Sequence, residues 1–299
     1  MGIEVGYLAQ IKNPTTIVTP LGDTVTYPEA RQIAYTKYGA AISLFTELAA
    51  NSSTSAQLLE RIRTPQINGA TRVSLLKLFR RCVAPNLDTE TTKKINKIAT
   101  AEIVAAYGNT FKPITLLKEQ FAAFGEVDKA NLAVLIGEYD TRGQSGYELS
   151  RIFFGWFEEN YSEIMTISGP RGAGPDVELH SVFPDFEGSF PCDFVIRDKS
   201  SDKPIAVGFI RYDSTRGGAQ SDDRTGGNAN KVAMARDYVA KGGKPFRIVF
   251  VSDGPGLAHG DIWTEACKLD GDWDDNVRVT SLKLASLRVT PDWLLPAKS

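Results

Sequence analysis

The sequence has little cysteine and little histidine. Of its 299 residues only three are cysteine and two are histidine. Cys82, Cys192 and Cys267 stand far apart without a CxxC pair, so a zinc site has few possible ligands. We therefore expect buried thiols. With only His180 and His259 present, a Ser-His-Asp or Cys-His mechanism is also disfavoured.

Membrane and nucleotide signatures are missing as well. The longest apolar runs, such as IVFV and NLAVLIG, are far too short to span a bilayer. The first residues, MGIEVGYLAQIKNP, lack the basic and apolar blocks of a signal peptide, which predicts a cytoplasmic protein without a membrane partner. There is no GxxxxGK[ST], complete GxGxxG or HExxH string, so no familiar nucleotide-binding loop or zinc-protease motif is present.

What is present is an ordinary globular composition with an uneven charge distribution. The chain is 42% hydrophobic and 23% charged, and its net charge of −2 gives no reason by itself to expect nucleic acid. Residues 61–81, however, hold six basic residues and no acidic one. A solvated helix face is the favoured interpretation of this run, and a phosphate-facing surface is the alternative.

The pattern of apolar residues divides the chain into two regions. Residues 1–140 show helical spacing and predict a mostly helical region, begun by a small strand pair at residues 16–27. Residues 141–299 predict an α/β core with a mixed sheet. The predicted elements of this core are a helix at 143–161, strands at 177–183, 193–198 and 204–212, a helix at 228–242, a strand at 246–252, a helix at 261–269 and a strand at 277–289. Their α-β-β-β-α-β order favours a sheet covered on both faces.

An acidic residue and a cation stand on neighbouring predicted strands. Asp193 opens one strand, and Arg211 lies near the end of the next. Alternate residues of a strand share a face, so Phe209 and Arg211 should point the same way. Such a hairpin could hold Mg²⁺ beside a scissile phosphate, with the cation stabilising the charge that builds on phosphorus. Carboxylates that could join Asp193 are Glu148, Asp176, Glu178 and Asp213.

This arrangement resembles the catalytic core of type II restriction endonucleases of the PD-(D/E)XK nuclease superfamily. In that resemblance Asp193 matches the metal-binding aspartate, and Phe-Ile-Arg at 209–211 matches the (D/E)XK tripeptide. The blocks GQSGYEL, GPRGAGPDVEL and RYDSTRGGAQSDDRTGGN are similar to a bacterial restriction-enzyme group. The resemblance covers about the C-terminal half. It implies a Mg²⁺-dependent, sequence-specific endonuclease that cuts double-stranded DNA as a homodimer.

The chain departs from the superfamily pattern at two positions. Phe209 occupies the acidic slot and cannot bind a metal, so a second carboxylate must come from elsewhere, and swapped positions are known in the superfamily. We expect Glu148 or Asp213 in that role. The next candidates are Asp222 and Asp223. Arg211 occupies the lysine slot, stays protonated, and is expected to stabilise the transition state rather than activate water. Pairing of Arg211 with Asp213 alone would weaken the nuclease assignment.

Two Pro-Asp dipeptides offer competing alignments. Pro184-Asp185 has no (D/E)XK string at a matching distance, so we interpret Asp185 as a turn residue. Pro175-Asp176 has Asp193 downstream, which supplies an acid but no cation. We favour Asp193 as the first carboxylate.

The glycine-punctuated stretch at residues 214–228, STRGGAQSDDRTGGN, predicts a loop that leads to a helix starting near Asn228. Arginine reads guanine, glutamine and asparagine read adenine, and aspartate accepts from cytosine in the major groove. The candidate base-reading residues are Arg216, Gln220, Asp222, Asp223, Arg224 and Asn228. Lys231 is a candidate phosphate contact or a helix-surface charge. Arg171, in the loop at residues 168–176, is a second cation that could approach DNA.

The same residues also allow different roles. Arginine–aspartate pairs could rigidify the stretch at 214–228 with no ligand at all. The helical region could supply dimer contacts, DNA-backbone contacts or both. A non-catalytic DNA-binding protein on a nuclease-like fold is the main alternative function, and a small-molecule-binding α/β protein is a more distant one.

Overall fold

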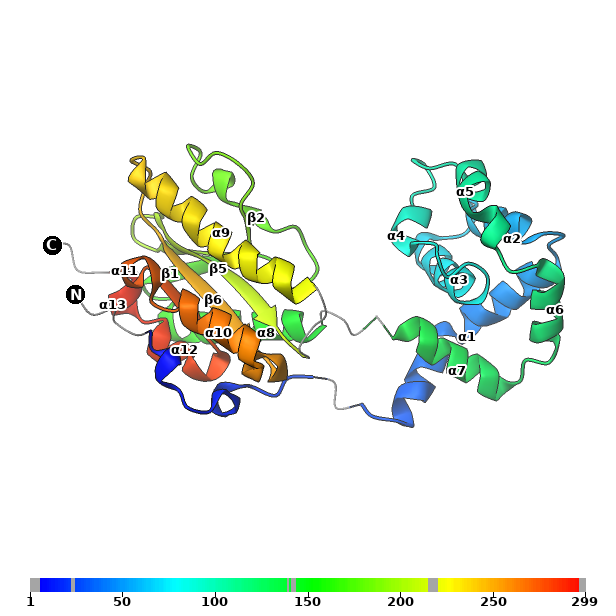
Figure 1. Cartoon of the computed structure of the whole chain (residues 1–299), viewed down its shortest axis with the longest axis horizontal. Coiled ribbons are helices and arrows are strands. Elements are labelled where there is room, and N and C mark those ends of the chain that lie inside the picture. The colour runs from blue at the N-terminus through cyan, green and yellow to red at the C-terminus, as the bar shows by residue number, and fades with distance from the viewer. Residues whose placement is uncertain (1–5, 23–24, 139, 141–143, 215–219, 296–299) are drawn as a thin grey trace. The chain divides into compact units, whose positions relative to one another are not determined.

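The structure is a computed structural model that describes residues 6–22, 25–138, 140, 144–214 and 220–295, with the backbone alone at 220–226. The chain divides into two compact units (Figure 1). The sheet unit comprises Met1–Gly22 with Gly143–Ser299, and the helical unit comprises Asp23–Arg142. Among the described residues, no helix combines the length and apolar character that crossing a bilayer requires.

Helices build the helical unit. They are α1 (Glu29–Ala50), α2 (Ser55–Ile62), α3 (Gly69–Cys82), α4 (Thr89–Thr92), α5 (Thr100–Tyr107), α6 (Ile114–Ala122) and α7 (Glu126–Gly137). Polar side chains begin three of them: Thr54, Asn68 and Asp88 each accept the backbone N–H three residues further on. The apolar faces meet in one core that includes Phe45 of α1 and Phe79 of α3.

A five-stranded mixed sheet forms the centre of the sheet unit, which confirms the predicted α/β class. Its strands are β1 (Met165–Ser168), β4 (Phe194–Asp198), β5 (Pro204–Tyr212), β6 (Arg247–Asp253) and β7 (Val277–Thr280), in that spatial order. The pairs β1–β4 and β4–β5 are antiparallel, whereas β5–β6 and β6–β7 are parallel. Two short strands, β2 (Val177–Glu178) and β3 (Pro191–Cys192), pair with each other separately.

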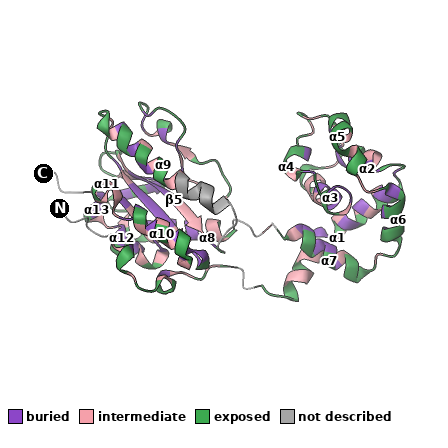
Figure 2. Cartoon of the chain, viewed as in Figure 1, coloured by how far each residue is buried: buried purple, intermediate pink, exposed green. Residues whose placement is uncertain are grey.

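Alternation along β5 divides its side chains between two cores. Val207 and Phe209 face α9 (Gln220–Ala240) and α10 (Gly260–Leu269). Ala206 and Ile210 lie in the core that includes α8 (Gln144–Tyr161). The sheet is therefore covered on both faces, as its nearly continuous apolar strands require. Figure 2 shows buried residues in the strands and exposed residues on the outer sides of the helices.

The chain closes the sheet unit with several short helices. They are α11 (Asp272–Asp275), α12 (Ala285–Arg288), α13 (Pro291–Leu294) and the 3₁₀ turns η1 (Leu8–Gln10), η2 (Pro14–Ile17), η4 (Leu179–Ser181), η5 (Pro255–Ala258) and η6 (Leu282–Leu284). A further 3₁₀ turn, η3 (Gly108–Thr110), lies in the helical unit.

The N-terminal segment differs from the prediction. Residues 6–22 pack with the sheet unit, although the sequence pattern assigned them to the helical region at 1–140. The N–H of Leu8 donates to Asp270 Oδ2 at 2.9 Å, and that of Thr19 donates to Asp253 Oδ1 at 2.6 Å. The predicted strand pair at 16–27 is absent from the described residues of that stretch. Instead, Asn13 caps η2 by accepting the N–H of Thr15.

Four other features of the fold differ from the prediction. The edge strand β1 was not predicted, because four residues carry too little alternation. The predicted strand at 177–183 is two residues of β2 followed by η4, and the predicted strand at 277–289 ends at Thr280. Helix α9 begins at Gln220 rather than near Asn228, since acidic residues such as those at 222–223 favour a helix N-terminus.

Candidate functional site

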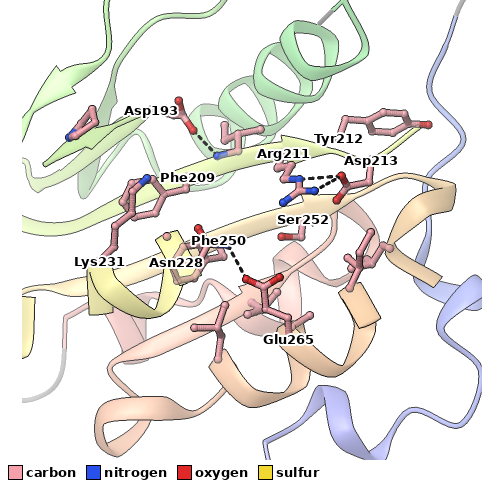
Figure 3. A pocket seen from close by; sticks show the side chains of 18 of the residues that line it. Asp193, Phe209, Arg211, Tyr212, Asp213, Asn228, Lys231, Phe250, Ser252 and Glu265 are labelled. Atoms are coloured by element: carbon pink, nitrogen blue, oxygen red, sulfur yellow. Dashed lines mark hydrogen bonds and ion pairs between the residues drawn. The ribbon is translucent and has the colours of Figure 1, made fainter. Parts of the chain in front are cut away.

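A pocket of about 510 Å³ lies over β5 and β6, on the face covered by α9 and α10 (Figure 3). Aromatic side chains form part of its floor, and both signs of charge enter it. The charged and polar residues that line it include Asp176, Asp193, Arg211, Asn228, Lys231 and Glu265. A half-enclosed cavity with a few convergent polar groups is the usual form of a ligand or active site.

Asp193 stands in this pocket where β3 passes into β4. Its N–H donates to Gly208 O at 2.9 Å, and its Oδ2 accepts the N–H of Ile210 at 2.6 Å, so both backbone and side chain are fixed to β5. Burial raises the pKa of Asp193 above its ordinary value, and the negative charge of Asp176 adds to that rise. The Ile210 hydrogen bond and the Lys231 charge oppose it.

Asp176 is the second carboxylate of the pocket. In the β2–β3 pair Val177 lies opposite Cys192, so the next position along brings Asp176 to the side of Asp193. Asp176 is exposed, whereas Asp193 is half-buried. The Pro175-Asp176 alignment therefore identified a real neighbour of Asp193. Glu178, the other acid of this strand, instead accepts the N–H of Phe190 at 3.0 Å and does not line the pocket.

Lys231 is a cation of the pocket that lies against Phe209. Its Nζ lies 3.7 Å from the centroid of the Phe209 ring. Phe209 is only 8% exposed and stacks on Phe250, with ring centroids 5.1 Å apart. Burial lowers the pKa of Lys231, while Asp193, Cys192 and Asp176 act in the opposite direction. The sequence predicted a phosphate contact or surface charge at Lys231, and the structure turns the side chain toward the sheet.

Arg211 shares the pocket but is engaged elsewhere. Its Nε and Nη2 donate to Asp213 Oδ1 at 2.8 and 2.7 Å, and the Asp213 side chain is only 7% exposed. Phe209 and Arg211 are alternate residues of the extended strand β5, so they lie on the same side of it, as predicted. Asp213, expected as a metal carboxylate, is instead the ion-pair partner of Arg211, and this is the pairing that was expected to weaken the nuclease assignment.

Two other predicted residues lie outside the pocket lining. Glu148 is on the exposed side of α8 and pairs with Arg151 at 2.6 Å. Arg171 pairs with Glu158, and its guanidinium carbon lies 5.1 Å from the centroid of the Phe154 ring. The structure therefore does not bring Glu148 to Asp193, and the cation of the 168–176 loop packs on α8.

Most of the predicted base-reading side chains lie outside the residues that the structure describes. Arg216 lies outside the described residues. The backbone of α9 includes Gln220, Asp222, Asp223 and Arg224, whose side chains are also outside the description. Asn228 is described, and its Nδ2 donates to Glu265 Oε1 at 3.3 Å within the pocket. Glu265 was missed in the sequence, because no motif surrounds it and only the packing of α10 on α9 brings it here.

Two carboxylates of the pocket, Asp176 and Asp193, are suitable ligands for Mg²⁺. Within the described residues there is no group of three or more His, Cys, Asp or Glu side chains that could hold a metal. Mg²⁺, however, is usually bound through one or two carboxylates and keeps several waters. Asp193 and Asp176 provide two carboxylates whose mutual repulsion contributes to the raised pKa of Asp193. A divalent cation would relieve that repulsion, so this pair fits Mg²⁺.

The three cysteines are wholly or partly buried. Cys192 is buried, donates to Val177 O at 3.1 Å, and has its pKa raised to about 12 by burial. Burial also raises the pKa of Cys82 to about 11, and Cys267 is half-buried. The expectation of buried thiols is thus confirmed for Cys192.

Asp185, of the competing Pro184-Asp185 dipeptide, lies in a turn, as predicted. Its Oδ1 accepts a hydrogen bond from the hydroxyl of Tyr238 at 2.9 Å.

Four of the six basic side chains in the run at 61–81 make polar contacts within the helical unit. Arg63 is 5% exposed and donates to the carbonyls of Thr92 and Ile98. Arg72 donates to two carbonyls in the connection between α2 and α3. Two further residues form ion pairs within the helical unit: Lys77 with Asp140, and Arg81 with Glu138. Much of the run therefore fixes the helices together, while Arg80 and Arg81 are exposed on α3, as a solvated helix face predicts.

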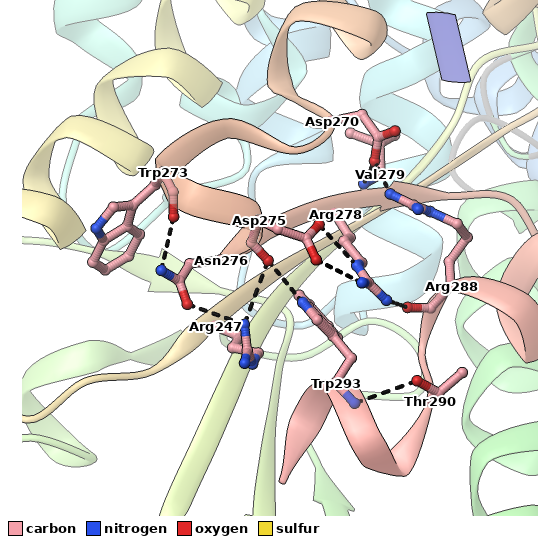
Figure 4. Close-up of polar contacts among 10 residues, drawn as sticks. All are labelled: Arg247, Asp270, Trp273, Asp275, Asn276, Arg278, Val279, Arg288, Thr290 and Trp293. Carbon is pink, nitrogen blue, oxygen red and sulfur yellow. Dashed lines mark hydrogen bonds and ion pairs between the residues drawn. The ribbon is translucent and has the colours of Figure 1, made fainter. Parts of the chain in front are cut away.

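A second hollow, of about 1330 Å³, lies beside α11. Figure 4 shows polar contacts of some residues that line it, such as the Asp275–Arg278 pair. Trp273, Asp274 and Asp275 have φ values of 52°, 54° and 60°, the left-handed region that non-glycine residues seldom adopt. Six charged side chains of the hollow pair with one another: Arg236 with Asp272, Arg278 with Asp275, and Arg288 with Asp270. With these charges satisfied internally, the pocket at Asp193 is the better candidate site.

Comparison with models of known families, with curated proteins and with solved structures finds no match to this chain.

Proposed function

We propose that this protein is a Mg²⁺-dependent endonuclease that cuts double-stranded DNA at specific sequences, as a type II restriction enzyme does. The proposal takes the sheet unit as a restriction-endonuclease-like core and the protein as a cytoplasmic homodimer. One observation carries it: Asp193, at the start of β4, shares a half-enclosed pocket with a second carboxylate, Asp176, and with the cations Arg211 and Lys231. Metal ligands and phosphate-binding cations are the two components that phosphodiester hydrolysis needs.

The proposed reaction is hydrolysis by in-line attack. A water oxygen forms a bond to phosphorus as the bond from phosphorus to the leaving sugar oxygen breaks. The water gives up a proton to solvent, and the leaving oxygen takes one up. Asp193 and Asp176 would hold Mg²⁺, which when bound supplies charge neutralisation and acidifies the attacking water. The pocket cations oppose the negative charge that develops on the phosphoryl oxygens.

The test is cleavage of a plasmid of complex sequence in the presence of Mg²⁺. We expect discrete fragments from the wild-type protein, none from Asp193→Ala, and retained sequence-specific binding by that variant in a gel-shift assay. Asp185→Ala is the matched control, because it removes the aspartate of the other Pro-Asp dipeptide, which lies in an exposed turn. Mg²⁺-dependent cleavage by Asp193→Ala would refute the site assignment.

A second candidate function is a non-catalytic DNA-binding protein. The observation that favours it is the aromatic side chain of Phe209 in the acidic slot, together with the lack of a three-carboxylate group among the described residues. Shifted but intact DNA would support this candidate. Neither a shift nor cleavage would leave a small-molecule ligand as the occupant of the pocket.

The proposed sequence readout rests on the chemistry of residues 214–228. If Arg216 and Arg224 each contact a base through two hydrogen bonds, replacing either with alanine should cost about 1–3 kcal/mol at the cognate site. An equal loss on all DNA sequences would identify them as phosphate contacts.

A further inference from the structure

The Phe209–Lys231 pair is the feature of the pocket that the proposed function leaves unexplained. We propose that Lys231 is the cation that contacts the scissile phosphate and that the Phe209 ring is the positioning residue that holds it. This inference rests on the proposed function, because it assigns roles within that site. It accounts for an aromatic residue at a position where a carboxylate was expected.

The first observation that supports this proposal is that the Lys231 ammonium is available to bind an anion. Within the described chain Lys231 makes no hydrogen bond and no ion pair, and its one specific contact is the ring face of Phe209. Arg211 differs, because Nε and Nη2 are both engaged by Asp213. Asp213 thus engages two of the five N–H groups of Arg211, whereas within the described chain all three of Lys231 are available to phosphoryl oxygens (Figure 3).

The second support is the rigidity of the ring. Phe209 lies between Phe190 and Phe250, with centroid separations of 5.8 and 5.1 Å, and it is almost fully buried. A ring that is held this way presents one fixed face to the pocket. An ammonium is attracted to that face by the quadrupole of the ring. The flexible lysine side chain is thereby confined to one region of the pocket.

The third support is chemical. A carboxylate at position 209 would accept hydrogen bonds from the ammonium and occupy the N–H groups that a phosphate needs. A ring face attracts the same charge without accepting a directed hydrogen bond from each N–H group. Phe209 thus places Lys231 close to Asp193 and still leaves the ammonium available to an anion.

The pair can be tested without DNA by nuclear magnetic resonance. In protein labelled at the lysine ε-carbon, the ε-protons of Lys231 should resonate upfield of the other lysines because of the Phe209 ring current. The signal is assigned by its loss in Lys231→Arg. It should keep its upfield shift in Phe209→Tyr and lose it in Phe209→Leu. An unshifted Lys231 signal in the wild-type protein would overturn the role of the ring.

The role in the reaction is tested by single-turnover cleavage. We expect Lys231→Gln to lower the rate by about 10²-fold, as removal of one transition-state donor does in other enzymes. Phe209→Leu should lower the single-turnover rate at saturating enzyme with little change in the enzyme concentration that gives half of that rate, and Phe209→Tyr should restore the rate. Lys244→Gln, at an exposed lysine outside the pocket lining, is the matched control.

The outcomes separate the two proposals. A wild-type rate in Lys231→Gln, with cleavage by the wild-type protein intact, overturns this inference and leaves the endonuclease standing. A wild-type protein that cuts no DNA overturns the proposed function and the catalytic role of Lys231, while the resonance experiment still decides whether the ring holds the lysine.

Discussion

Arg211 donates from both Nε and Nη2 to the same oxygen of Asp213, two residues further along the chain. Asp213 is in turn tied to the end of β6, since its N–H donates to Asp253 O at 2.8 Å and its carbonyl accepts the N–H of Gly256 at 2.7 Å. Arg211 is thereby linked to the ends of the two parallel strands β5 and β6. Its position depends on a carboxylate that had been expected to bind metal.

The Arg211–Asp213 pair should contribute measurably to stability. Because the Asp213 side chain is only 7% exposed, solvent screens the pair weakly, and we expect Arg211→Ala and Asp213→Ala each to lower the free energy of unfolding by about 1–3 kcal/mol. A double-mutant cycle measured by urea unfolding isolates the pair, because the double variant should cost less than the sum of the two. Strict additivity would show that the two side chains are not coupled.

Asp176 should control the ionisation of Asp193. The negative charge of Asp176 contributes to the raised pKa of Asp193, so Asp176→Asn should lower that pKa. The titration of the Asp193 carboxyl carbon, followed by nuclear magnetic resonance without Mg²⁺, measures it directly. Glu178→Gln is the control, because Glu178 lies on the same short strand but outside the pocket lining. An unchanged Asp193 pKa in Asp176→Asn would mean that the two carboxylates are not neighbours.

Asp193 should lower the stability of the fold at neutral pH. Its folded pKa is raised above the ordinary 3.8, so ionisation is harder in the folded than in the unfolded chain, and stability falls as the pH rises through the folded pKa. Asp193→Asn keeps an oxygen for the Ile210 N–H and removes the charge. We expect a higher urea midpoint than wild type at pH 7 and a smaller difference as the pH falls toward 4. A variant less stable than wild type at pH 7 would contradict this sign.

Asp140 should stabilise the helical unit at neutral pH, because its folded pKa is lowered whereas that of Asp193 is raised. Burial alone would raise its pKa, but hydrogen bonds from Lys37, Lys77 and Tyr38 outweigh burial and lower it to about 2. The stabilisation is complete above the unfolded value and is lost as the pH falls through the folded one. After allowance for solvent screening, Asp140→Asn should cost about 1 kcal/mol at pH 7. Unfolding followed by circular dichroism should show this cost shrink between pH 4 and pH 2.

Arg288 should be one of the most sensitive positions of the sheet unit. It pairs with Asp270, which is 4% exposed and also accepts the N–H groups of Leu8 and Val279 at 2.9 and 3.0 Å (Figure 4). Arg288→Ala leaves that carboxylate buried without its counter-charge, and we expect a loss of about 3–5 kcal/mol. Arg236→Ala, at a half-exposed pair, should cost about 1 kcal/mol or less. Thermal unfolding compares the two, and equal losses would argue against a buried pair.

Several elements could be predicted from the sequence because local pattern determines them. Strand β5 lies at 204–212, as expected, and α10 and β6 fall within about one residue of the expected bounds. Asp193 likewise stands at the start of a strand. Each of these segments has a clear apolar period and a proline, glycine or acidic residue at its edge, so local chemistry agrees with the final fold.

The full set of residues in the candidate site could not be predicted from the sequence, because the packing of separate elements brings these residues together. Asp176 reaches Asp193 through a strand pair of two residues on each side, which leaves almost no periodic signal. Lys231 turns inward because of the rotation of α9, whose first part is rich in glycine and polar residues and has no clear apolar face. Glu265 enters from α10, which has no motif around it.

The docking of residues 6–22 onto the sheet unit has a consequence for how the chain folds. The N–H of Thr19 bonds to Asp253, which is 234 residues away, and that of Leu8 bonds to Asp270, which is 262 residues away. During synthesis the helical unit leaves the ribosome before either carboxylate exists. Local contacts form faster than distant ones. Residues 6–22 are synthesised before the helical unit, and they therefore reach their place in the sheet unit only after Asp253 and Asp270 have been made.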